Sequence, residues 1–335
     1  MTMTKPFGLV AIEAEMARQA SDALASYDQA GPVAADLARG LRQTGRLLML
    51  GMGASHAVNR AVEPLYRGLG VDALALPVSE QLGMGVPLDG KTVILASQSG
   101  ESAEVIRWLS SQKAGEVFGM TLDGHATLAC AVPSMVAVGG AEMAFAATRS
   151  LTLTFALHLA VLAELGYGPA PALTALRQLP APDIVPAVDA LERVRCVVTS
   201  GRRLQGVAEA AALGLCELSQ TPAFSLEGGQ LRHGPMEIMS PDLGVVLFAS
   251  DEPDAGLVLG MARSASEAGA KVVLFDASGL PRVPGVTTVT LPKSSGMAAI
   301  LTTLPAMQCF MLGYAAQRVA DVGTPRRSSK ITRTE

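Results

Sequence analysis

Residues 92–102 read TVILASQSGES, a short apolar run followed directly by six small or polar residues. A strand, a polar turn and then a helix make up one βα unit of a parallel sheet. Similar apolar runs alternate with helical stretches through the first half of the chain, at residues 47–50, 73–78, 117–122 and 135–138. Continuous apolar strands of this length are typical of a parallel sheet covered by helices on both faces. The sequence therefore predicts an α/β fold.

The second half of the chain repeats this pattern. Its apolar runs correspond in order to those of the first half and lie at residues 196–201, 245–250 and 271–276. The stretch GYGPAP, residues 166–171, breaks the chain between the halves. We therefore expect two tandem doubly wound parallel-sheet domains of the flavodoxin-like type. The expected organisation is a helical brace at residues 1–44, a first domain at 45–170, a second domain at 171–320 and a tail at 321–335.

The composition narrows the class of protein. A formal net charge of -4 leaves no basic excess to follow a phosphodiester backbone, so no nucleic-acid partner is expected. Four cysteines without CxxC spacing predict buried thiols in a reducing compartment, with no disulfide and no zinc site. The most apolar stretch, residues 143–165, is interrupted by charged side chains, and the N-terminus does not resemble an export signal. We therefore expect a cytoplasmic protein that does not bind a membrane.

The polar turn at residues 97–102 predicts an anion site. Free N–H groups at the start of the following helix point outward, and the helix dipole favours negative charge there. Gly100 lets the backbone approach a ligand closely. Further donors come from the side chains of Ser97, Gln98, Ser99 and Ser102. A single serine here would be interpreted as an ordinary N-cap, but six consecutive small or polar residues favour the site.

A second turn of similar kind, GMGAS, follows the first strand. Because ligands in open α/β sheets bind at the carboxyl ends of the strands, Ser55 can face the same anion, with Gly53 and Ala54 beside it. The corresponding polar turn of the second half carries Asp251 and Glu252, whose carboxylates would repel a phosphate. Only the first half is therefore expected to hold phosphate.

At SQSGES the chain resembles the sugar isomerase (SIS) domain family. Further motifs of that family follow in the right order, at residues 51–55, 141–142, 147–149, 234–235 and in the C-terminal tail. Within the family, the pattern is similar to the isomerase half of glucosamine-6-phosphate synthases and to stand-alone glucosamine-6-phosphate deaminases. The resemblance implies two tandem SIS domains that act on a sugar phosphate without a cofactor or a metal ion.

The resemblance also implies roles for single residues. The phosphate-binding positions of the family match Ser55, Ser97, Gln98, Ser99 and Ser102. Glu217 matches the base that forms the enediol, His233 the histidine that opens the sugar ring, and Lys330 the Schiff-base lysine. Phe145 and Arg232, together with Gly53, Ala54 and Gly100, complete the expected substrate pocket.

Glu217 and Lys330 can each be interpreted in a second way. Proton transfer between C1 and C2 of a sugar needs a base of near-neutral pKa, and burial on the apolar helix at residues 204–218 would raise the pKa of Glu217. Without the resemblance, a salt bridge from Glu217 to Arg202 or Arg203 would be expected. Lys330 would then belong to a solvated basic tail. The resemblance favours the catalytic interpretation of both residues.

The chain departs from the synthase pattern at several positions. It leads directly into the helical brace, so we expect no release of ammonia from glutamine by this chain alone. Gly214 replaces a lysine one turn before Glu217, Arg149 replaces a lysine after Thr148, and Gln230 replaces a glutamate. The first of these changes alters the groups available for proton transfer.

These observations predict a phosphosugar isomerase and deaminase that converts glucosamine 6-phosphate to fructose 6-phosphate and ammonia. One alternative is a deglycase or isomerase for a fructosamine or galactosamine phosphate, and another is a non-catalytic sugar-phosphate sensor. Large apolar helix faces at residues 148–165 and 297–312 predict a homodimer, and the resemblance implies that its active sites are shared. The sugar and its epimer remain open at this point.

Overall fold

A computed structural model describes residues 5–111 and 116–334 of the chain. The predicted brace and tail also include residues 1–4 and 335, which lie outside the described residues. The chain divides into two compact units. The first-sheet unit comprises Ala14–Leu176 and Pro325–Glu335, and the second-sheet unit comprises Met1–Glu13 and Arg177–Thr324.

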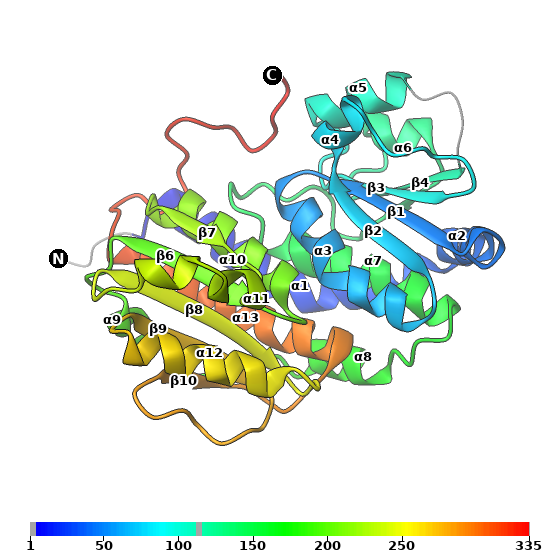
Figure 1. Ribbon diagram of the computed structural model, residues 1–335. Helices are drawn as coiled ribbons and strands as arrows, with labels where there is room; N and C mark the ends of the chain where they lie inside the picture. Colours follow the sequence, from blue (N-terminus) through cyan, green and yellow to red (C-terminus); the bar gives the residue numbers. More distant parts are fainter. Residues whose placement is uncertain (1–4, 112–115, 335) are drawn as a thin grey trace. The chain divides into compact units, whose positions relative to one another are not determined.

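The first-sheet unit is built on a parallel five-stranded sheet with the order β2-β1-β3-β4-β5 (Figure 1). Its strands are β1 (Arg46–Gly51), β2 (Asp72–Pro77), β3 (Thr92–Ala96), β4 (Glu116–Thr121) and β5 (Ser134–Val136). Its helices are α2 (Gly31–Thr44), α3 (Gly53–Gly68), α4 (Val78–Leu82), α5 (Ala103–Ser111), α6 (Thr127–Ala131) and α7 (Arg149–Glu164). Two further helices, α1 (Phe7–Gln29) and α8 (Ala170–Arg177), contain residues of both units.

The second-sheet unit contains a second parallel five-stranded sheet, with the order β10-β9-β8-β6-β7. Its strands are β6 (Cys196–Gly201), β7 (Ala223–Ser225), β8 (Leu243–Ser250), β9 (Lys271–Ala277) and β10 (Thr287–Thr290). Its helices are α9 (Val185–Ala190), α10 (Gln205–Ser219), α11 (Gly228–Arg232), the 3-10 helix η1 (Pro235–Ile238), α12 (Ala255–Glu267) and α13 (Gly296–Ala316).

The two sheets share one topology. Read from β7, the second sheet runs β7-β6-β8-β9-β10, which matches β2-β1-β3-β4-β5 strand for strand. Within each repeat this is the order 2-1-3-4-5 of flavodoxin-like folds. The predicted α/β class, the parallel sheets and the internal repeat are therefore confirmed.

The core of the first-sheet unit fixes where α5 begins. Trp108 of α5 is fully buried and belongs to one apolar cluster with Leu48, Leu50, Val93 and Leu95 of the sheet. Large aromatic side chains dominate the packing energy of such clusters. Burial of Trp108 therefore holds α5 against the sheet and sets its first turn beside the carboxyl end of β3.

The two helices whose apolar faces predicted a homodimer are mostly buried in the chain itself. Residues 149–162 of α7 are all buried. Helix α13 is long and apolar enough to cross a membrane by length and composition, but 78% of its 18-residue window is buried, which suits a core helix. These faces give no argument for a second copy of the chain, and the homodimer stays a prediction.

The cysteines correct one expectation. All four are free, but Cys130, Cys216 and Cys309 are exposed and only Cys196 is partly buried. The prediction of buried thiols was wrong because the three exposed cysteines lie on helices, on which neighbouring positions in an apolar segment can face solvent.

Candidate functional site

The two predicted phosphate turns lie at the topological switch point of the first sheet. Strands β1 and β3 are neighbours, and the chain continues from β1 to β2 on one side and from β3 to β4 on the other. Helix α3 begins at Gly53 directly after β1, and α5 begins at Ala103 shortly after β3. Open α/β sheets bind ligands at this point, outside the carboxyl ends of the strands.

The SQSGES turn holds its serine hydroxyls in fixed positions. The backbone N–H of Gly100 donates to Ser97 Oγ at 3.1 Å, and the N–H of Glu101 donates to Ser99 Oγ at 3.2 Å. Ser97 Oγ also lies 3.5 Å from Ser102 Oγ. A hydroxyl that accepts a hydrogen bond keeps its own hydrogen for another partner. The turn can therefore present hydroxyl donors to an anion.

Gly100 is required by the geometry of this turn. Its φ of +66° lies in the left-handed region, and a Cβ placed there would come within 2.5 Å of Ala126 Cβ. Any other residue would combine backbone strain with a steric clash. The packing explains why glycine stands here, and its predicted close approach to a ligand stays a prediction.

Backbone N–H groups contribute less to the turn than the sequence predicts. The N–H groups of Gly100 and Glu101 are already bonded to serine hydroxyls, and the N–H of Ala103 donates to Thr332 O at 2.9 Å. Gln98 Nε2, in contrast, is buried and has no hydrogen-bond partner among the described residues. Since a buried unpaired donor is costly, a bound anion would stabilise this amide. The Gln98 amide and the serine hydroxyls are thus side-chain donors that a ligand could use.

The GMGAS turn is the second of the two predicted phosphate turns. Gly53 has a φ of +48° and begins α3, and Ser55 in the first turn of that helix is 5% exposed. Next to it, burial lowers the pKa of His56, with a further lowering from the nearby Arg60 guanidinium. His56 is therefore neutral near pH 7 and adds no positive charge beside the turn.

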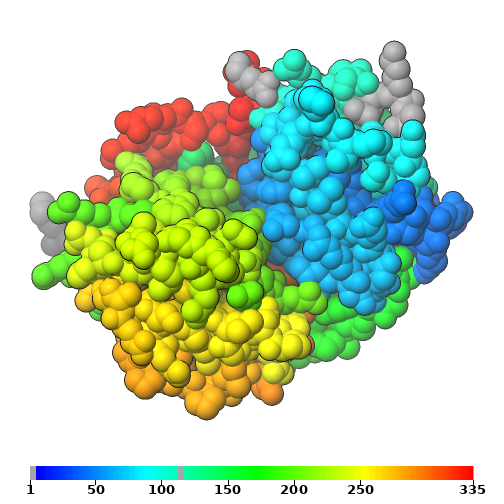
Figure 2. All heavy atoms as spheres, viewed as in Figure 1, coloured from blue at the N-terminus to red at the C-terminus, as the bar shows by residue number. Residues whose placement is uncertain are grey.

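Lys330 is held in the first-sheet unit by an ion pair. Its Nζ lies 2.9 Å from Oε2 of Glu142, a carboxylate that is 1% exposed. The predicted pocket residue Phe145 is half-buried and belongs to the same loop as Glu142. Most of the tail is exposed, as the red atoms of Figure 2 show, but the ion pair between Lys330 and Glu142 attaches it to the first-sheet unit. Glu142 lies in a motif that the sequence singles out, yet nothing in the sequence pairs it with a residue 188 positions away.

The remaining predicted residues lie in the second-sheet unit. Glu217 is half-buried on α10, whereas Arg232 and His233 are exposed at the end of α11. His233 is followed by Gly234 with a φ of +104°, a turn that keeps the imidazole on a loop. The catalytic roles of Glu217, His233 and Lys330 stay predictions.

The two arginines proposed as alternative partners for Glu217 form other ion pairs. Arg202 lies 3.5 Å from Glu227, and Arg203 lies 3.8 Å from Glu252.

Packing explains two departures from the synthase pattern. A Cβ at Gly214 would come within 2.6 Å of Met311 Sδ, because α10 and α13 approach closely there. Arg149 is fully buried and pairs with Glu15 at 2.6 Å and Asp22 at 3.1 Å. A side chain at position 214 would therefore displace the flexible end of Met311, and Arg149 is held by its two ion pairs and is not free to reach a substrate.

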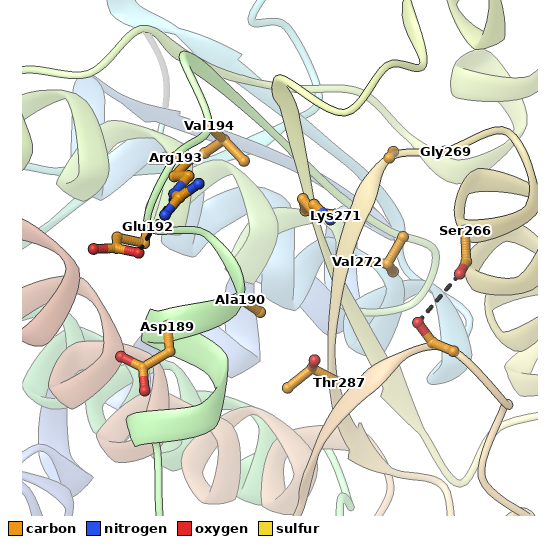
Figure 3. Close-up of a pocket in the computed structure, with 12 residues that line it drawn as sticks. Asp189, Ala190, Glu192, Arg193, Val194, Ser266, Gly269, Lys271, Val272 and Thr287 are labelled. Carbon is orange, nitrogen blue, oxygen red and sulfur yellow. Dashed lines mark hydrogen bonds and ion pairs between the residues drawn. The ribbon is translucent and has the colours of Figure 1, made fainter.

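A separate hollow lies at the other end of the second sheet. It has a volume of about 660 Å³ and is lined by residues including Glu192, Arg193, Lys271 and Thr287 (Figure 3). Lys271 and Thr287 begin their strands, so the hollow lies at the amino ends, away from the usual ligand position. None of the predicted site residues lines it.

Residues 5–111 and 116–334 contain no group of three or more His, Cys, Asp or Glu side chains that could hold a metal ion.

Comparison with known proteins gives relatives of one kind. No family model matches the chain. It is 26% identical over 327 residues to glutamine–fructose-6-phosphate aminotransferase (isomerizing) of Bordetella parapertussis, an alignment that covers 88% of this chain and 52% of the relative. The chain thus spans about half the length of the curated relatives it matches.

Solved structures agree with this similarity. The C-terminal domain of glucosamine-fructose-6-phosphate aminotransferase from Francisella tularensis superposes with a TM-score of 0.81 at 17% identity, covering 94% of this chain and 98% of that one. Glucosamine-6-phosphate deaminase from Thermotoga maritima gives a TM-score of 0.71 at 18% identity, covering 92% and 99%. The chain therefore has the tandem sugar-isomerase (SIS) fold and resembles the isomerase half of the aminotransferases, as its motifs predicted.

Proposed function

We propose that this protein is an amino-sugar phosphate isomerase and deaminase that converts glucosamine 6-phosphate and water to fructose 6-phosphate and ammonia. The observation that carries the proposal is the donor set at the switch point. Fixed serine hydroxyls and the buried Gln98 amide nitrogen, which has no partner among the described residues, suit a phosphate group at this position. The names of the similar proteins, an isomerizing aminotransferase and a deaminase, support the choice of reaction.

Each predicted residue has a part in the proposed reaction. The turns at Ser55 and Ser97–Ser102 hold the phosphate and so orient the sugar chain. His233 opens the ring by proton transfer at the ring oxygen, and Glu217 moves the proton between C2 and C1. The proton transfer gives an iminium at C2; the Lys330 amine adds to C2 and expels ammonia, and water then hydrolyses the lysine imine to fructose 6-phosphate and free lysine.

The direct test is an assay for both products. Purified protein and glucosamine 6-phosphate should yield ammonia and fructose 6-phosphate in equal amounts. Glu217→Gln should lower kcat by roughly 10²–10⁴-fold, the usual contribution of a general base, with little change in phosphate affinity. Glu209→Gln, on the same helix, is the matched control. Absence of both products with wild-type protein would rule the proposed reaction out.

A second candidate is an isomerase or deglycase for another amino-sugar phosphate. Gly214 favours it, because this chain lacks the lysine that the synthase pattern has one turn before the base. The same assay with galactosamine 6-phosphate and fructosamine 6-phosphate separates the two candidates. Tight binding of every sugar phosphate without turnover would instead indicate a sensor.

A further inference from the structure

The Glu142 carboxylate is fixed by neighbours on several sides. Oε1 accepts hydrogen bonds from Thr148 N at 3.0 Å, Thr148 Oγ1 at 3.1 Å and Ser150 N at 3.3 Å. Oε2 accepts one from Ser150 Oγ at 2.5 Å. A buried carboxylate with this many donors keeps one orientation. The remaining side of Oε2 faces Lys330 Nζ at 2.9 Å.

The loop that carries Glu142 is itself braced. The guanidinium of Arg149 donates to Gly140 O at 2.7 Å and to Val138 O at 3.3 Å, and the same group is paired with Glu15. Arg18 adds a hydrogen bond to Gly139 O at 3.0 Å. Buried charge pairs of this kind resist displacement because breaking them leaves a charge uncompensated. The position of Glu142 is therefore rigid relative to the first sheet.

The tail is attached to the unit that carries the SQSGES turn. Besides the ion pair of Lys330, the N–H of Ala103 donates to Thr332 O, so the tail also contacts the first residue of α5. The side chain of Lys330 is 28% exposed, which leaves its amine reachable from solvent. The tail is thus attached at two points, by Lys330 to a buried anion and by Thr332 to the helix that follows the phosphate turn.

We propose that Glu142 is the positioning residue and proton acceptor for Lys330, an inference that rests on the proposed function. Oε2 takes one proton from the Lys330 ammonium, and the neutral amine adds to the C2 carbonyl carbon of the open-chain ketose phosphate. The protonated Glu142 then returns that proton to the C2 hydroxyl, which leaves as water. The products are a protonated imine on Lys330 and an ionised Glu142 beside it, so atoms and charges balance.

Borohydride trapping tests this step. Wild-type protein is incubated with fructose 6-phosphate and sodium borohydride, which reduces the imine to a stable amine, and the labelled residue is identified by mass spectrometry. Lys330 should be labelled at neutral pH. Glu142→Gln should be labelled at least tenfold more slowly at pH 7 and should recover at alkaline pH, where hydroxide in solution can take the proton that Glu142 takes in the wild-type protein.

The pH profile separates this role from a merely structural one. If Glu142 only anchored Lys330, its loss would lower labelling by the same factor at every pH. That result would overturn the proposal, and so would labelling of Glu142→Gln at the wild-type rate. Glu80→Gln, an exposed carboxylate of the same unit, is the matched control and should behave as wild type. Inorganic phosphate binding and the thermal melt show whether Glu142→Gln is folded. If it is not, Glu142→Asp replaces it and should give slowed labelling with the wild-type pH profile; unslowed labelling of this variant would overturn the proposal.

The proposed function can fail separately. Turnover of glucosamine 6-phosphate without any label on Lys330 would overturn the lysine step and with it the role of Glu142, while the reaction itself would stand. Neither label nor turnover in the wild-type protein would reject the reaction and the inference together.

Discussion

The turns after β3 and β8 occupy equivalent positions in two sheets of identical topology, yet they carry opposite chemistry. After β3, the chain presents hydroxyls and an amide nitrogen without a partner in the described part of the chain. After β8, Glu252 accepts a hydrogen bond from Gly296 N at the start of α13 and lies 3.8 Å from Arg203. The second-sheet unit thus places a protein carboxylate at a helix N-terminus, where an external anion would otherwise be stabilised. A duplicated fold can keep one copy open to a ligand and close the other with its own side chain.

The two units also differ in the burial of their arginines. This difference gives the largest expected effect on stability. Arg149 of the first-sheet unit is fully buried with two carboxylates, whereas Arg195 of the second-sheet unit is 86% exposed beside Asp242. Arg149→Met should lower the free energy of unfolding by roughly 3–5 kcal/mol, because Glu15 and Asp22 lose their buried partner. Arg195→Met should change it by less than about 1 kcal/mol. Urea denaturation measures the free energy of unfolding of each variant. Equal losses in the two variants would contradict the contrast between the buried and the exposed arginine.

The second-largest effect is expected when the SQSGES turn receives a carboxylate like the one in the turn after β8. Ser99→Asp places a carboxylate in the SQSGES turn, as Glu252 does in the other half. Repulsion should weaken the binding of sugar phosphate by at least about 100-fold, or about 2.7 kcal/mol. Isothermal titration calorimetry measures the change.

Two controls accompany this exchange. Ser110→Asp, on the exposed face of α5, should bind almost as wild type. Glu252→Gln should leave phosphate affinity unchanged, and a large loss of affinity in that variant would show that the second turn also contributes to the site.

The smallest of the three effects is a dependence of stability on pH. His158 is fully buried between Tyr66 OH at 3.1 Å and Asn59 Oδ1 at 3.2 Å, and burial lowers its pKa from 6.5 to about 3. The folded state then binds fewer protons than the unfolded state below pH 6.5. The stability from this group is complete above pH 6.5 and falls as the pH drops toward 3, by about 2 kcal/mol between pH 7.5 and pH 5.

Unfolding free energies measured across this pH range test the effect. His158→Gln should flatten the profile, and His233→Gln, at an exposed position of the second-sheet unit, should leave it unchanged. A profile of unchanged slope in His158→Gln would exclude the buried imidazole as its source.

The sequence predicted the central strands better than the edges. Strands β3 and β6 begin and end at the predicted residues, because continuous apolar runs bounded by polar turns define buried strands. Strands β7 and β10 were not predicted. Each has only three or four residues and lies at a sheet edge, where partial burial leaves no clear apolar pattern.

For the candidate site, the sequence predicted the residue types but not their contacts. The SQSGES turn follows β3 as expected, yet the capture of two backbone N–H groups by Ser97 and Ser99 depends on the left-handed Gly100 and cannot be read from composition. The same holds for Glu142 and Arg149, whose ion-pair partners lie more than a hundred positions away in the chain. Long-range pairs of this kind follow from topology, not from local pattern.

The attachment of the tail to the first-sheet unit has a consequence for synthesis. The ribosome makes Glu142 well before Lys330, and the 188 positions between them include the whole second sheet. At 5–20 residues per second, translation of that interval takes roughly 10–40 s. Through this time the nascent first sheet can form, but Glu142 has no lysine to pair with. The ion pair that the proposed chemistry needs can therefore form only after the second sheet has been synthesised.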